Sequence, residues 1–347
     1  MHSVPRDRRM SPDIGEAGRE LATGTGRLQT VVGAPPAARL LAFGSARPDD
    51  IVSGHALGAP FGKPMEWVER RTGIRQVRRA RRSEHLVELA ELAGRRALAT
   101  VGGNGRSVDL VIVATCSAQQ AGMEAARRLA PTAPAFTLNG ACSGFCYALQ
   151  AADGFVRTGS AGHVLILAVE HMSALIDGQD LGTSIIFGDG AGAAVVGPTE
   201  VDSRMHVAIG PTVSGSDGGR EHLIAQDADD PNFLRMAGQD VFRWAIDEIP
   251  AIAREACRRA DVTLADVEVF VPHQANLRII DSLARSLELE HAVIADDIVL
   301  AGNTSAASIP MAVDALLRSG RARSGQLALF VGFGAGLAYA AQVVTLP

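Results

Sequence analysis

The chain has 347 residues, 47% of them hydrophobic, so it can bury a large core and could hold two domains or two fused halves. This composition excludes a disordered protein, and the formal net charge of −5 gives no sign of a nucleic-acid partner. The cysteines have no paired metal-ligand spacing and lie in apolar surroundings, which indicates a reducing cytosol and no metal site; they are Cys116, Cys142, Cys146 and Cys257.

The N-terminal stretch, residues 1–37, is rich in Arg, Gly, Ala and Pro, which predicts a disordered extension. It lacks the sustained apolar segment of a signal peptide. Further along, glycines and charged residues interrupt every apolar run before it reaches the roughly 20 residues needed to span a bilayer. We therefore expect a soluble, cytoplasmic protein with no membrane contact.

From residue 38 onward, short β-rich runs alternate with helical patterns, which predicts a layered α/β architecture. In the first part we expect strands at 40–43, 110–114, 135–138, 164–169 and 191–196, and helices at 85–99 and 144–157. A similar order follows residue 201, with strands at 207–209, 267–272 and 327–332 and helices at 239–259, 279–287 and 306–318. The order recurs without a visible residue-level repeat.

Cys142 stands in the segment GACSGF, between an apolar strand-like run and a helical pattern. The free N–H groups and the dipole of a helix start stabilise an anion, so this position favours a thiolate nearer neutral pH than in a free cysteine. The alternative for a cysteine considered alone is a buried small hydrophobe.

Two further polar residues stand at strand-to-helix junctions: His273 in VPHQAN and Asn303 in GNTSAAS. Strand ends of open α/β sheets carry ligand sites. A lone His or Asn usually packs in the core or caps a helix. Together with Cys142, these residues make three polar side chains at three strand-to-helix junctions, which favours the hypothesis that they form one functional site.

Two glycine-rich segments need separate interpretations. Residues 188–192 (GDGAG) have neither the spacing of a dinucleotide-binding fingerprint nor the Lys-Ser/Thr of a phosphate-binding loop, so we interpret them as a structural turn. Residues 332–336 (GFGAG) follow an apolar strand, and their glycines would allow another segment to approach the backbone closely.

Seven ordered segments carry a family resemblance: WVERRTGIR (67–75), the cysteine segment, IFGDGAGAA (186–194), MAGQDVF (236–242), VPHQANLRI (271–279), GNTSAAS (302–308) and GFGAG. Through them the chain, from about residue 38 to its C-terminus, resembles the ketoacyl-ACP synthase III family of condensing enzymes, of the secondary-metabolism type. The resemblance implies a thiolase fold in which two similar halves, 38–205 with the cysteine and 206–347 with the histidine and asparagine, form five layers, αβαβα. It also implies a homodimer.

The resemblance implies a reaction in two steps. Cys142 would attack an acyl thioester, with its own N–H and that of Ala335 as the oxyanion hole. A malonyl-type thioester would then lose carbon dioxide, and His273 Nε2 and the Asn303 carboxamide would donate to the enolate oxygen. Acyl-CoA or acyl-carrier thioesters would be the substrates, and we expect no cofactor.

Binding residues follow from the same resemblance. Trp67, Arg71 and Gln239 would hold the coenzyme A nucleotide or the pantetheine arm, although core packing is the alternative for Trp67. The docking face for an acidic acyl carrier protein would comprise Arg243, Arg278 and Arg285. Surface arginines on helices are often merely solvated, which is the alternative for these three.

Two positions depart from the family pattern. Gly122 stands where relatives often have a bulky apolar residue that closes the acyl pocket, and Leu181 where users of acetyl-CoA often have an arginine near the nucleotide. These departures predict an acyl primer larger than acetyl, as in a secondary-metabolite pathway.

Two other functions stay open. An acyltransferase would pass the acyl group from Cys142 to an oxygen, nitrogen or sulfur acceptor without decarboxylation. A non-catalytic thiolase-fold partner subunit would be expected to lack the nucleophile, so Cys142 argues against it. A papain-like protease uses the same residue types, but the C-G-S-C-W neighbourhood of its cysteine is absent.

Overall fold

The computed structural model describes residues 37–81, 83–103, 107–199 and 207–347. The extension predicted at residues 1–37 lies outside these ranges up to residue 36, and the predicted boundary between the halves at residue 205 also lies outside them. Ala37, the last residue of that extension, already belongs to the first strand, β1 (Ala37–Ala46).

The first sheet has five strands in the order β1-β7-β6-β4-β5. After β1, these are β4 (Leu110–Ala114), β5 (Ala135–Leu138), β6 (Val164–Glu170) and β7 (Gly190–Thr199). β4, β5 and β6 run parallel, whereas β7 pairs antiparallel with β6 and with β1. Every residue of β4 and β6 is buried, as expected for parallel strands covered on both faces, which is why continuous apolar runs mark them in the sequence.

The second sheet also has five strands, in the order β12-β11-β13-β14-β8. They are β8 (Val213–Ser216), β11 (Val269–Pro272), β12 (Val293–Ile294), β13 (Leu327–Gly334) and β14 (Ala338–Thr345). The strand predicted at 207–209 is wrong, because in this segment only Ile209 pairs, in an isolated bridge to Val344.

The two sheets repeat one topology. Taken in chain order, β1, β4, β5, β6 and β7 occupy the same places in the first sheet as β8, β11, β12, β13 and β14 in the second. In each sheet, an equivalent backbone hydrogen bond lies at the start of a parallel strand pair. Asp109 N–H donates to the His163 carbonyl before β4 and β6, and Glu268 N–H donates to the Leu327 carbonyl where β11 and β13 begin, both at 2.9 Å. The duplication that the sequence pattern hides is therefore present in the backbone.

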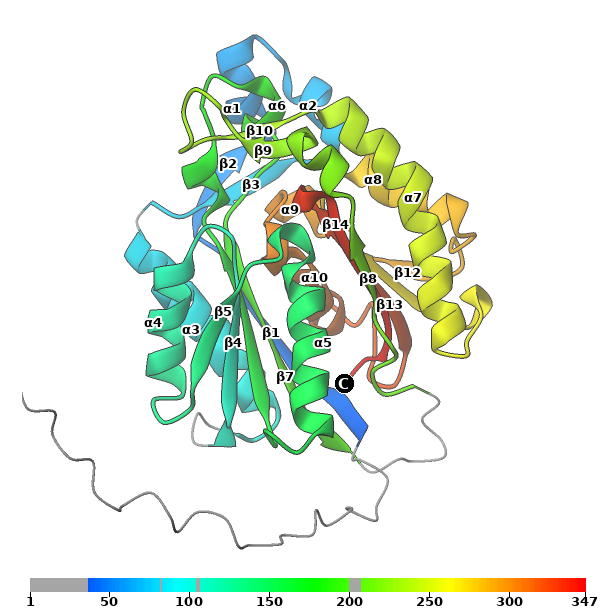
Figure 1. Cartoon of the computed structure of the whole chain (residues 1–347). Coiled ribbons are helices and arrows are strands. Elements are labelled where there is room, and N and C mark those ends of the chain that lie inside the picture. The colour runs from blue at the N-terminus through cyan, green and yellow to red at the C-terminus, as the bar shows by residue number, and fades with distance from the viewer. Residues whose placement is uncertain (1–36, 82, 104–106, 200–206) are drawn as a thin grey trace, which may run out of the picture. The chain divides into compact units, whose positions relative to one another are not determined.

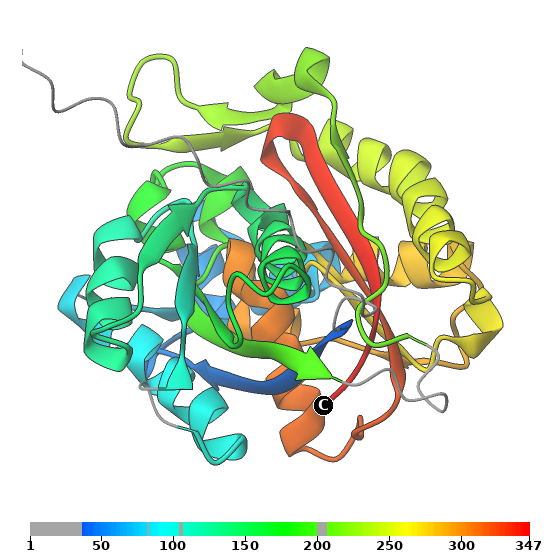
Figure 2. The same ribbon diagram turned by 60° about the horizontal axis from the view of Figure 1, so that its bottom comes forward.

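Helices cover both faces of each sheet (Figures 1 and 2). In the part of the chain that the structure describes, the helices of ten or more residues are α3 (Ser83–Thr100), α4 (Gln119–Leu129), α5 (Gly144–Arg157), α7 (Gly238–Arg259), α8 (Leu277–Ser286) and α10 (Ser308–Arg318). α3 and α4 pack on the outer face of the first sheet, α7 and α8 on the outer face of the second, and α5 and α10 lie between the sheets. The predicted five-layer αβαβα arrangement of the thiolase fold is confirmed.

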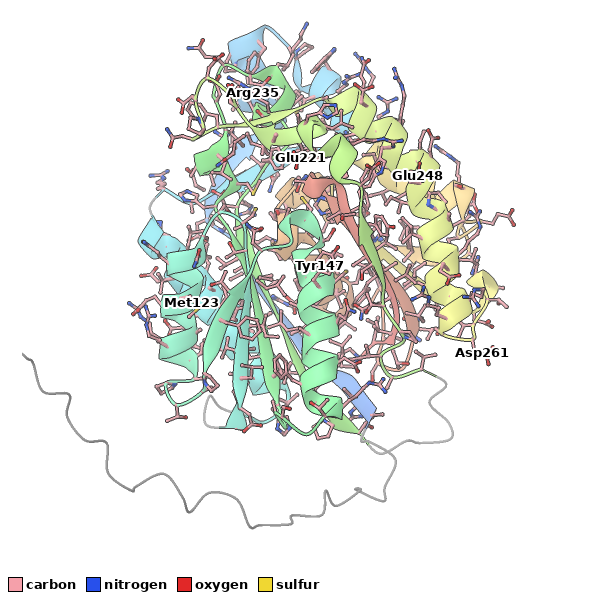
Figure 3. All side chains as sticks on the ribbon, viewed as in Figure 1. Met123, Tyr147, Glu221, Arg235, Glu248 and Asp261 are labelled. Atoms are coloured by element: carbon pink, nitrogen blue, oxygen red, sulfur yellow. The ribbon has the colours of Figure 1, made fainter. Side chains whose placement is uncertain are left out.

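Burial follows this layering. In α10, which lies in the central layer, nearly every side chain is buried. In α8, an outer helix, only one face is buried, and Asn276 caps its start by accepting a hydrogen bond from the Arg278 N–H. The central helices also connect the sheets: the Tyr147 hydroxyl, on α5, donates to the carbonyls of Gly215 and Tyr339 in the second sheet (Figure 3).

Shorter elements gather at the end of the molecule where α5 and α10 begin (Figure 1). They include the β-pairs β2 (Asp50–Ser53) with β3 (Gln76–Arg79) and β9 (Ile224–Gln226) with β10 (Leu234–Met236). The short helices are α1 (Gly54–Gly58), α2 (Met65–Thr72), α6 (Leu181–Ser184) and α9 (Ile298–Ala301). Among the described residues, 3₁₀ segments at this end are η1 (Ala59–Phe61), η3 (Ala141–Ser143), η4 (Met172–Leu175), η5 (Gly218–Leu223), η7 (Ser305–Ala307) and η8 (Ala335–Leu337). A further 3₁₀ turn, η6 (Leu264–Asp266), follows α7.

Candidate active site

The turn η3 sets the position of Cys142 at the entry to α5. The Asn139 Oδ1 atom accepts a hydrogen bond from the Ala141 N–H at 3.1 Å, and Ser143 N–H donates to the Gly140 carbonyl at 3.0 Å. Ala141 has φ 45°, a left-handed conformation that costs a residue with a side chain about 1–3 kcal/mol. Backbone strain directly before the candidate nucleophile is typical of a functional turn.

The Cys142 thiol is enclosed by segments from the second sheet. The Ser305 hydroxyl and the Ala335 N–H, together with the N–H of Cys142 itself, are hydrogen-bond donors to its sulfur. Gly334 has no side chain because there is no room for one: a Cβ at this position would lie 2.6 Å from the Cys142 Cβ and 2.9 Å from its Sγ. The glycine-rich segment therefore approaches the cysteine closely, as its composition indicated.

Burial raises the pKa of the Cys142 thiol to about 12, and the hydrogen bonds from Ser305 and the two backbone N–H groups offset only part of this effect. The sequence led us to expect that the helix start lowers the pKa of this thiol. Burial acts in the opposite direction, because desolvation disfavours the charged form.

His273 follows β11 and is buried, with burial lowering the pKa of its imidazole to about 3. Its Nδ1 atom lies 2.7 Å from the Ser308 Oγ atom, which also accepts a hydrogen bond from the Gln274 N–H. Because Ser308 can then give its own proton to Nδ1, the neutral tautomer with hydrogen on Nε2 fits this geometry. The Phe333 ring packs nearly perpendicular to the imidazole at a centroid distance of 5.5 Å.

Asn303 lies just before η7 and is held through its backbone and its side chain. Its N–H donates to the Ile186 carbonyl at 2.9 Å, and its carbonyl accepts from the Gly188 N–H at 3.0 Å. Its Oδ1 atom accepts from the Ser305 N–H at 2.9 Å. With the oxygen committed to Ser305, the Nδ2 group is the part of the amide that can donate to a ligand.

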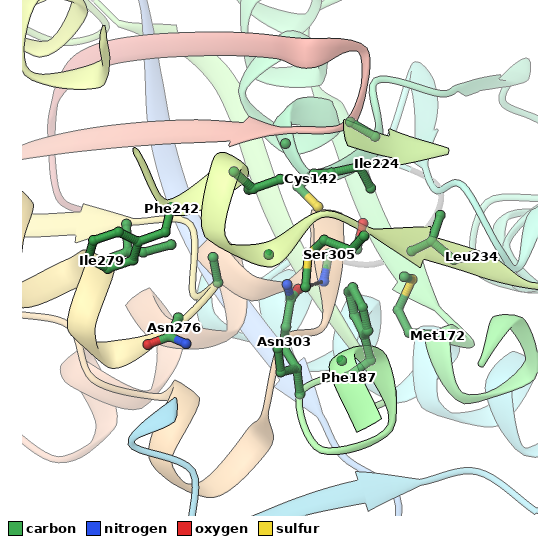
Figure 4. A pocket seen from close by; sticks show the side chains of 18 of the residues that line it. Cys142, Met172, Phe187, Ile224, Leu234, Phe242, Asn276, Ile279, Asn303 and Ser305 are labelled. Atoms are coloured by element: carbon green, nitrogen blue, oxygen red, sulfur yellow. Dashed lines mark hydrogen bonds between the residues drawn. The ribbon is translucent and has the colours of Figure 1, made fainter. Parts of the chain in front are cut away.

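A pocket of about 970 Å³ joins these three side chains (Figure 4). Cys142, Ser305 and Asn303 point into the same part of it, and His273 and Ala335 line it as well. The rest of the wall is mainly apolar, including Met172, Leu175, Ile185, Phe187, Ile224 and Leu234. An apolar cavity around a thiol and neutral amide and imidazole donors suits an acyl chain attached to a thioester.

The predicted ligand-binding residues also reach this pocket, which is lined by Trp67, Arg71, Leu181 and Gln239. Trp67 is partly exposed, and the Lys63 ammonium group lies 5.3 Å from its ring centroid. Core packing alone therefore does not account for Trp67.

The three predicted docking arginines are exposed. Arg243 and Arg278 line the pocket, the first paired with Asp240 at 3.1 Å and the second with its guanidinium 5.5 Å from the centroid of the Phe242 ring. Arg285 lies further along α8 and does not line the pocket.

Gly122 requires a correction. It lies in α4, buried, and is absent from the pocket wall. A Cβ at this position would lie 2.4 Å from Val113 Cγ1 and 3.0 Å from Val169 Cγ1, so the glycine allows α4 to pack tightly against the sheet. The departure from the family pattern at this position is a packing feature and does not enlarge the cavity of this chain.

Three residues around Cys142 escaped the sequence reasoning: Cys116, Glu170 and Ser305. The Cys116 sulfur lies 3.5 Å from the Ser305 Oγ atom and 3.4 Å from a Glu170 carboxylate oxygen. An acidic residue ending the apolar run VLILAVE was a readable signal for Glu170, since buried charges need partners. Ser305 had no comparable signal, because its role depends on the meeting of the two sheets.

Over residues 37–81, 83–103, 107–199 and 207–347, no group of three or more His, Cys, Asp and Glu side chains is arranged to hold a metal ion. Nor does this part of the chain contain a helix long and apolar enough to cross a membrane.

Two family models match the sequence. That of 3-oxoacyl-[acyl-carrier-protein] synthase III matches residues 136–218, and that of its C-terminal region matches residues 257–346. Among curated relatives, the beta-ketoacyl-[acyl-carrier-protein] synthase III of Mycobacteroides abscessus is 43% identical, covering 89% of this chain and 94% of the relative. The corresponding synthase III 1 of Streptomyces coelicolor is 41% identical, covering 90% and 97%.

Solved structures agree with this result. The priming β-ketosynthase from the R1128 polyketide biosynthetic pathway superimposes with a TM-score of 0.85 at 42% identity, covering 91% of this chain and 98% of that one. The 3-oxoacyl-(acyl carrier protein) synthase III of Pseudomonas aeruginosa gives a TM-score of 0.82 at 33% identity, with 90% and 98% covered. The chain belongs to the beta-ketoacyl-[acyl-carrier-protein] synthase III family of condensing enzymes.

Proposed function

We propose that this protein primes Cys142 with an acyl group from a thioester and then condenses it, with loss of carbon dioxide, with a malonyl-type thioester. The observation that carries the proposal is the meeting of Cys142, His273 and Asn303 in one apolar pocket. A thiol can hold an acyl group, and two neutral donors can stabilise an enolate without losing a proton themselves.

In the priming step, a bond forms between the Cys142 sulfur and the acyl carbonyl carbon, and the bond from that carbon to the donor sulfur breaks. The thiol proton of Cys142 leaves with the donor thiol. The Cys142 and Ala335 N–H groups, which approach the cysteine sulfur, serve as the oxyanion hole. Gly334, without a side chain, lets the glycine-rich segment approach the thiol closely and bring the Ala335 N–H beside it.

In the condensation step, the malonyl-type group loses its carboxylate as carbon dioxide, and the electron pair moves to the enolate oxygen. The Nε2–H of His273 and the Nδ2–H of Asn303 donate to that oxygen. The enolate carbon then bonds to the acyl carbonyl carbon, the bond from that carbon to the Cys142 sulfur breaks, and the released thiolate takes up a proton from water. The low pKa of His273 supports this role, because the imidazole stays neutral and keeps one fixed proton across the working pH range.

The test is incubation of the full chain with an acyl donor and a malonyl-carrier carrying ¹⁴C in the free carboxyl group. Release of labelled carbon dioxide with a β-ketoacyl product of the expected mass supports the condensing function. Unchanged malonyl-carrier with acylated acceptor would identify an acyltransferase to an oxygen, nitrogen or sulfur acceptor. No acyl-enzyme and no product under any donor would indicate a non-catalytic partner subunit.

The primer that we propose is larger than acetyl, as in a secondary-metabolite pathway. Gly122 does not support this choice of primer, but two other observations do. The wall of the pocket is mainly apolar, and it includes Leu181, at the position where the family resemblance implies an arginine that would bind the phosphates of coenzyme A. The R1128 relative acts as a priming ketosynthase in a polyketide pathway, which agrees with this choice. A panel of acetyl, branched, longer and aromatic donors, each on coenzyme A and on carrier, tests it through kcat/KM.

For partners, we propose an acidic acyl carrier protein and a second copy of this chain. Arg243 and Arg278 support the first, since both are exposed and line the pocket. The free edge of β5 supports the second: it is the outermost strand of the first sheet, and Phe136 on it is 37% exposed. An open sheet edge with an exposed aromatic side chain is a ready pairing surface.

A further inference from the structure

Glu170 is a buried carboxylate that the proposed reaction does not use. It ends β6, and its relative exposure is 0%. Its oxygens accept hydrogen bonds from the Thr115 hydroxyl at 3.1 Å and from the N–H groups of Cys116 and Ser117, each at 3.1 Å. The Ser117 hydroxyl donates as well. Within the described ranges, no lysine, arginine or histidine forms an ion pair with it, so hydrogen bonds alone support this group.

One further donor comes from the turn that leads into the central helix α10. The Ala306 N–H, in η7, points at the Glu170 carboxylate with an N···O distance of 3.4 Å. Glu170 therefore spans the junction between the first sheet and the turn that carries Asn303. The Cys116 sulfur lies between this carboxylate and the neighbouring Ser305 hydroxyl, 3.4 Å from a Glu170 oxygen and 3.5 Å from the Ser305 Oγ atom.

Ala306 is the structural counterpart of Cys142. Both are the middle residue of a 3₁₀ turn that leads into a central helix, η3 before α5 and η7 before α10. Ala141 and Ser305, which precede them, have φ 45° and 47°. The bonds that close the two turns also agree, Ser143 N–H to the Gly140 carbonyl and Ala307 N–H to the Thr304 carbonyl, both at 3.0 Å.

The strand that faces each turn follows the same correspondence. Gly334 ends β13 and faces Cys142, and Glu170 ends the equivalent strand β6 and faces Ala306. At the first turn, the functional side chain, the Cys142 thiol, is on the turn and the facing strand ends in a glycine. At the second turn, the turn residue Ala306 has only a methyl group and the facing strand ends in the Glu170 carboxylate. The Ala306 N–H, which corresponds to the oxyanion-hole N–H of Cys142, already has an anion as its partner.

We propose that Glu170 is a positioning residue: its carboxylate fills the second, equivalent anion site. By holding Ala306 directly, and Ser305 through the Cys116 sulfur, it fixes the turn that follows Asn303. The connection to Asn303 is direct, because the Asn303 Oδ1 atom accepts from the Ser305 N–H. A shift of the turn would thus move the amide that donates to the enolate.

Glu170 also acts on the thiols beside it. Its negative charge raises the pKa of Cys142, although burial is the larger cause, and it raises that of Cys116 in the same way. The other polar groups that face Glu170 are the hydroxyls of Thr115, Ser117 and Ser305, which carry no charge. Removing the charge should therefore lower the Cys142 pKa while loosening the turn of Asn303.

The test compares Glu170→Gln with the wild type in two assays: the rate of Cys142 alkylation by iodoacetamide between pH 7 and 10, read by peptide mass, and malonyl-carrier decarboxylation. Glutamine keeps the size of the side chain but loses the charge and replaces one acceptor oxygen with a donor. We expect alkylation at pH 8 to become about threefold to tenfold faster, since one pKa unit changes the thiolate fraction about tenfold. We expect decarboxylation to fall by about tenfold or more, as when an oxyanion donor is misplaced.

Two further variants keep the outcome decisive. Asp314→Asn removes another buried carboxylate, on α10 itself but outside the pocket, and should leave Cys142 alkylation unchanged. Glu170→Asp keeps the charge on a shorter arm, so alkylation should stay near the wild-type rate while decarboxylation falls. The proposal would be overturned if Asp314→Asn changed the alkylation and decarboxylation rates as much as Glu170→Gln does. It would also be overturned if Glu170→Asp were alkylated faster than the wild type.

The decarboxylation assay rests on the proposed function, whereas the alkylation assay does not. A wild-type protein that fails to decarboxylate malonyl-carrier would therefore contradict the condensing function. Beside an active wild type, unchanged decarboxylation in Glu170→Gln would contradict the positioning of Asn303 by Glu170. An alkylation rate in Glu170→Gln equal to that of the wild type would contradict the effect of the Glu170 charge on Cys142, whatever the reaction.

Discussion

Asn139 and Asn303 make the same hydrogen bond on the two sides of the site. The side-chain oxygen of each accepts from the N–H two residues later, Asn139 from Ala141 at 3.1 Å and Asn303 from Ser305 at 2.9 Å. Both side chains line the pocket. One turn design therefore leads into both central helices, with the thiol on one side and the amide donor on the other.

Removal of the candidate nucleophile should separate the two proposed steps. Cys142→Ala should abolish covalent acylation, whereas His273→Ala and Asn303→Ala should retain an acyl-enzyme but lose condensation by about 100-fold or more, the scale of a lost oxyanion donor. Intact-mass spectra and carbon dioxide release measure the two steps independently. A stable acyl adduct on the Cys142→Ala protein would refute the nucleophile assignment.

The buried imidazole of His273 should make stability depend on pH. Its pKa is about 3 in the folded protein and near 6.5 when exposed, so the unfolded chain binds an extra proton between these values. Stability should therefore fall as the pH drops below about 6.5, by about 1.4 kcal/mol per pH unit from this group alone. Urea unfolding of wild type and His273→Asn from pH 7 to pH 5 checks this: the difference in unfolding free energy should change across that range, and parallel curves would contradict it.

Charge reversal at the pocket rim should weaken carrier docking. Arg243→Glu and Arg278→Glu should raise KM for carrier-bound substrate and reduce the salt dependence of binding, with little effect on a small thioester analogue. Arg285→Glu tests whether the docking face extends along α8. Arg258→Glu, at the far end of α7, is the matched control and should behave as wild type. Equal losses on carrier and analogue would indicate a damaged site instead.

Donor choice should respond to position 181 and not to position 122. Leu181→Arg adds a cation at the pocket wall and should raise kcat/KM for donors on coenzyme A relative to the same acyl groups on carrier. Gly122→Ala should leave that ratio unchanged but lower the unfolding free energy by about 1–3 kcal/mol, because its Cβ would overlap Val113. A changed donor preference in Gly122→Ala without loss of stability would restore the enlarged-pocket hypothesis.

The free edge of β5 should be the dimer contact. Phe136→Asp places a charge on this edge and should convert the proposed homodimer to a monomer in sedimentation experiments. Leu92→Asp, at another exposed apolar side chain, on α3, is the matched control and should not. A dimer that survives Phe136→Asp would place the contact elsewhere.

Most of the layered fold could be predicted from the sequence, because buried parallel strands such as β6 form continuous apolar runs. The three polar residues at the strand-to-helix junctions were visible for a similar reason, since such junctions interrupt apolar runs. The role of Gly122 could not be predicted, because a missing side chain can mark either an open cavity or a tight helix contact. The raised pKa of Cys142 was hidden too, since it depends on how completely the second sheet encloses the thiol.

The enclosure of Cys142 also makes this thiol a reporter of assembly. Ser305, Gly334 and Ala335, which surround the sulfur, come from segments more than 160 residues away along the chain. A chain in which the first sheet had formed without the second would leave the cysteine in water, with the ordinary acidity and labelling rate of a free thiol. Slow alkylation of Cys142 during refolding should therefore mark the moment when the two sheets have joined, before any substrate is added.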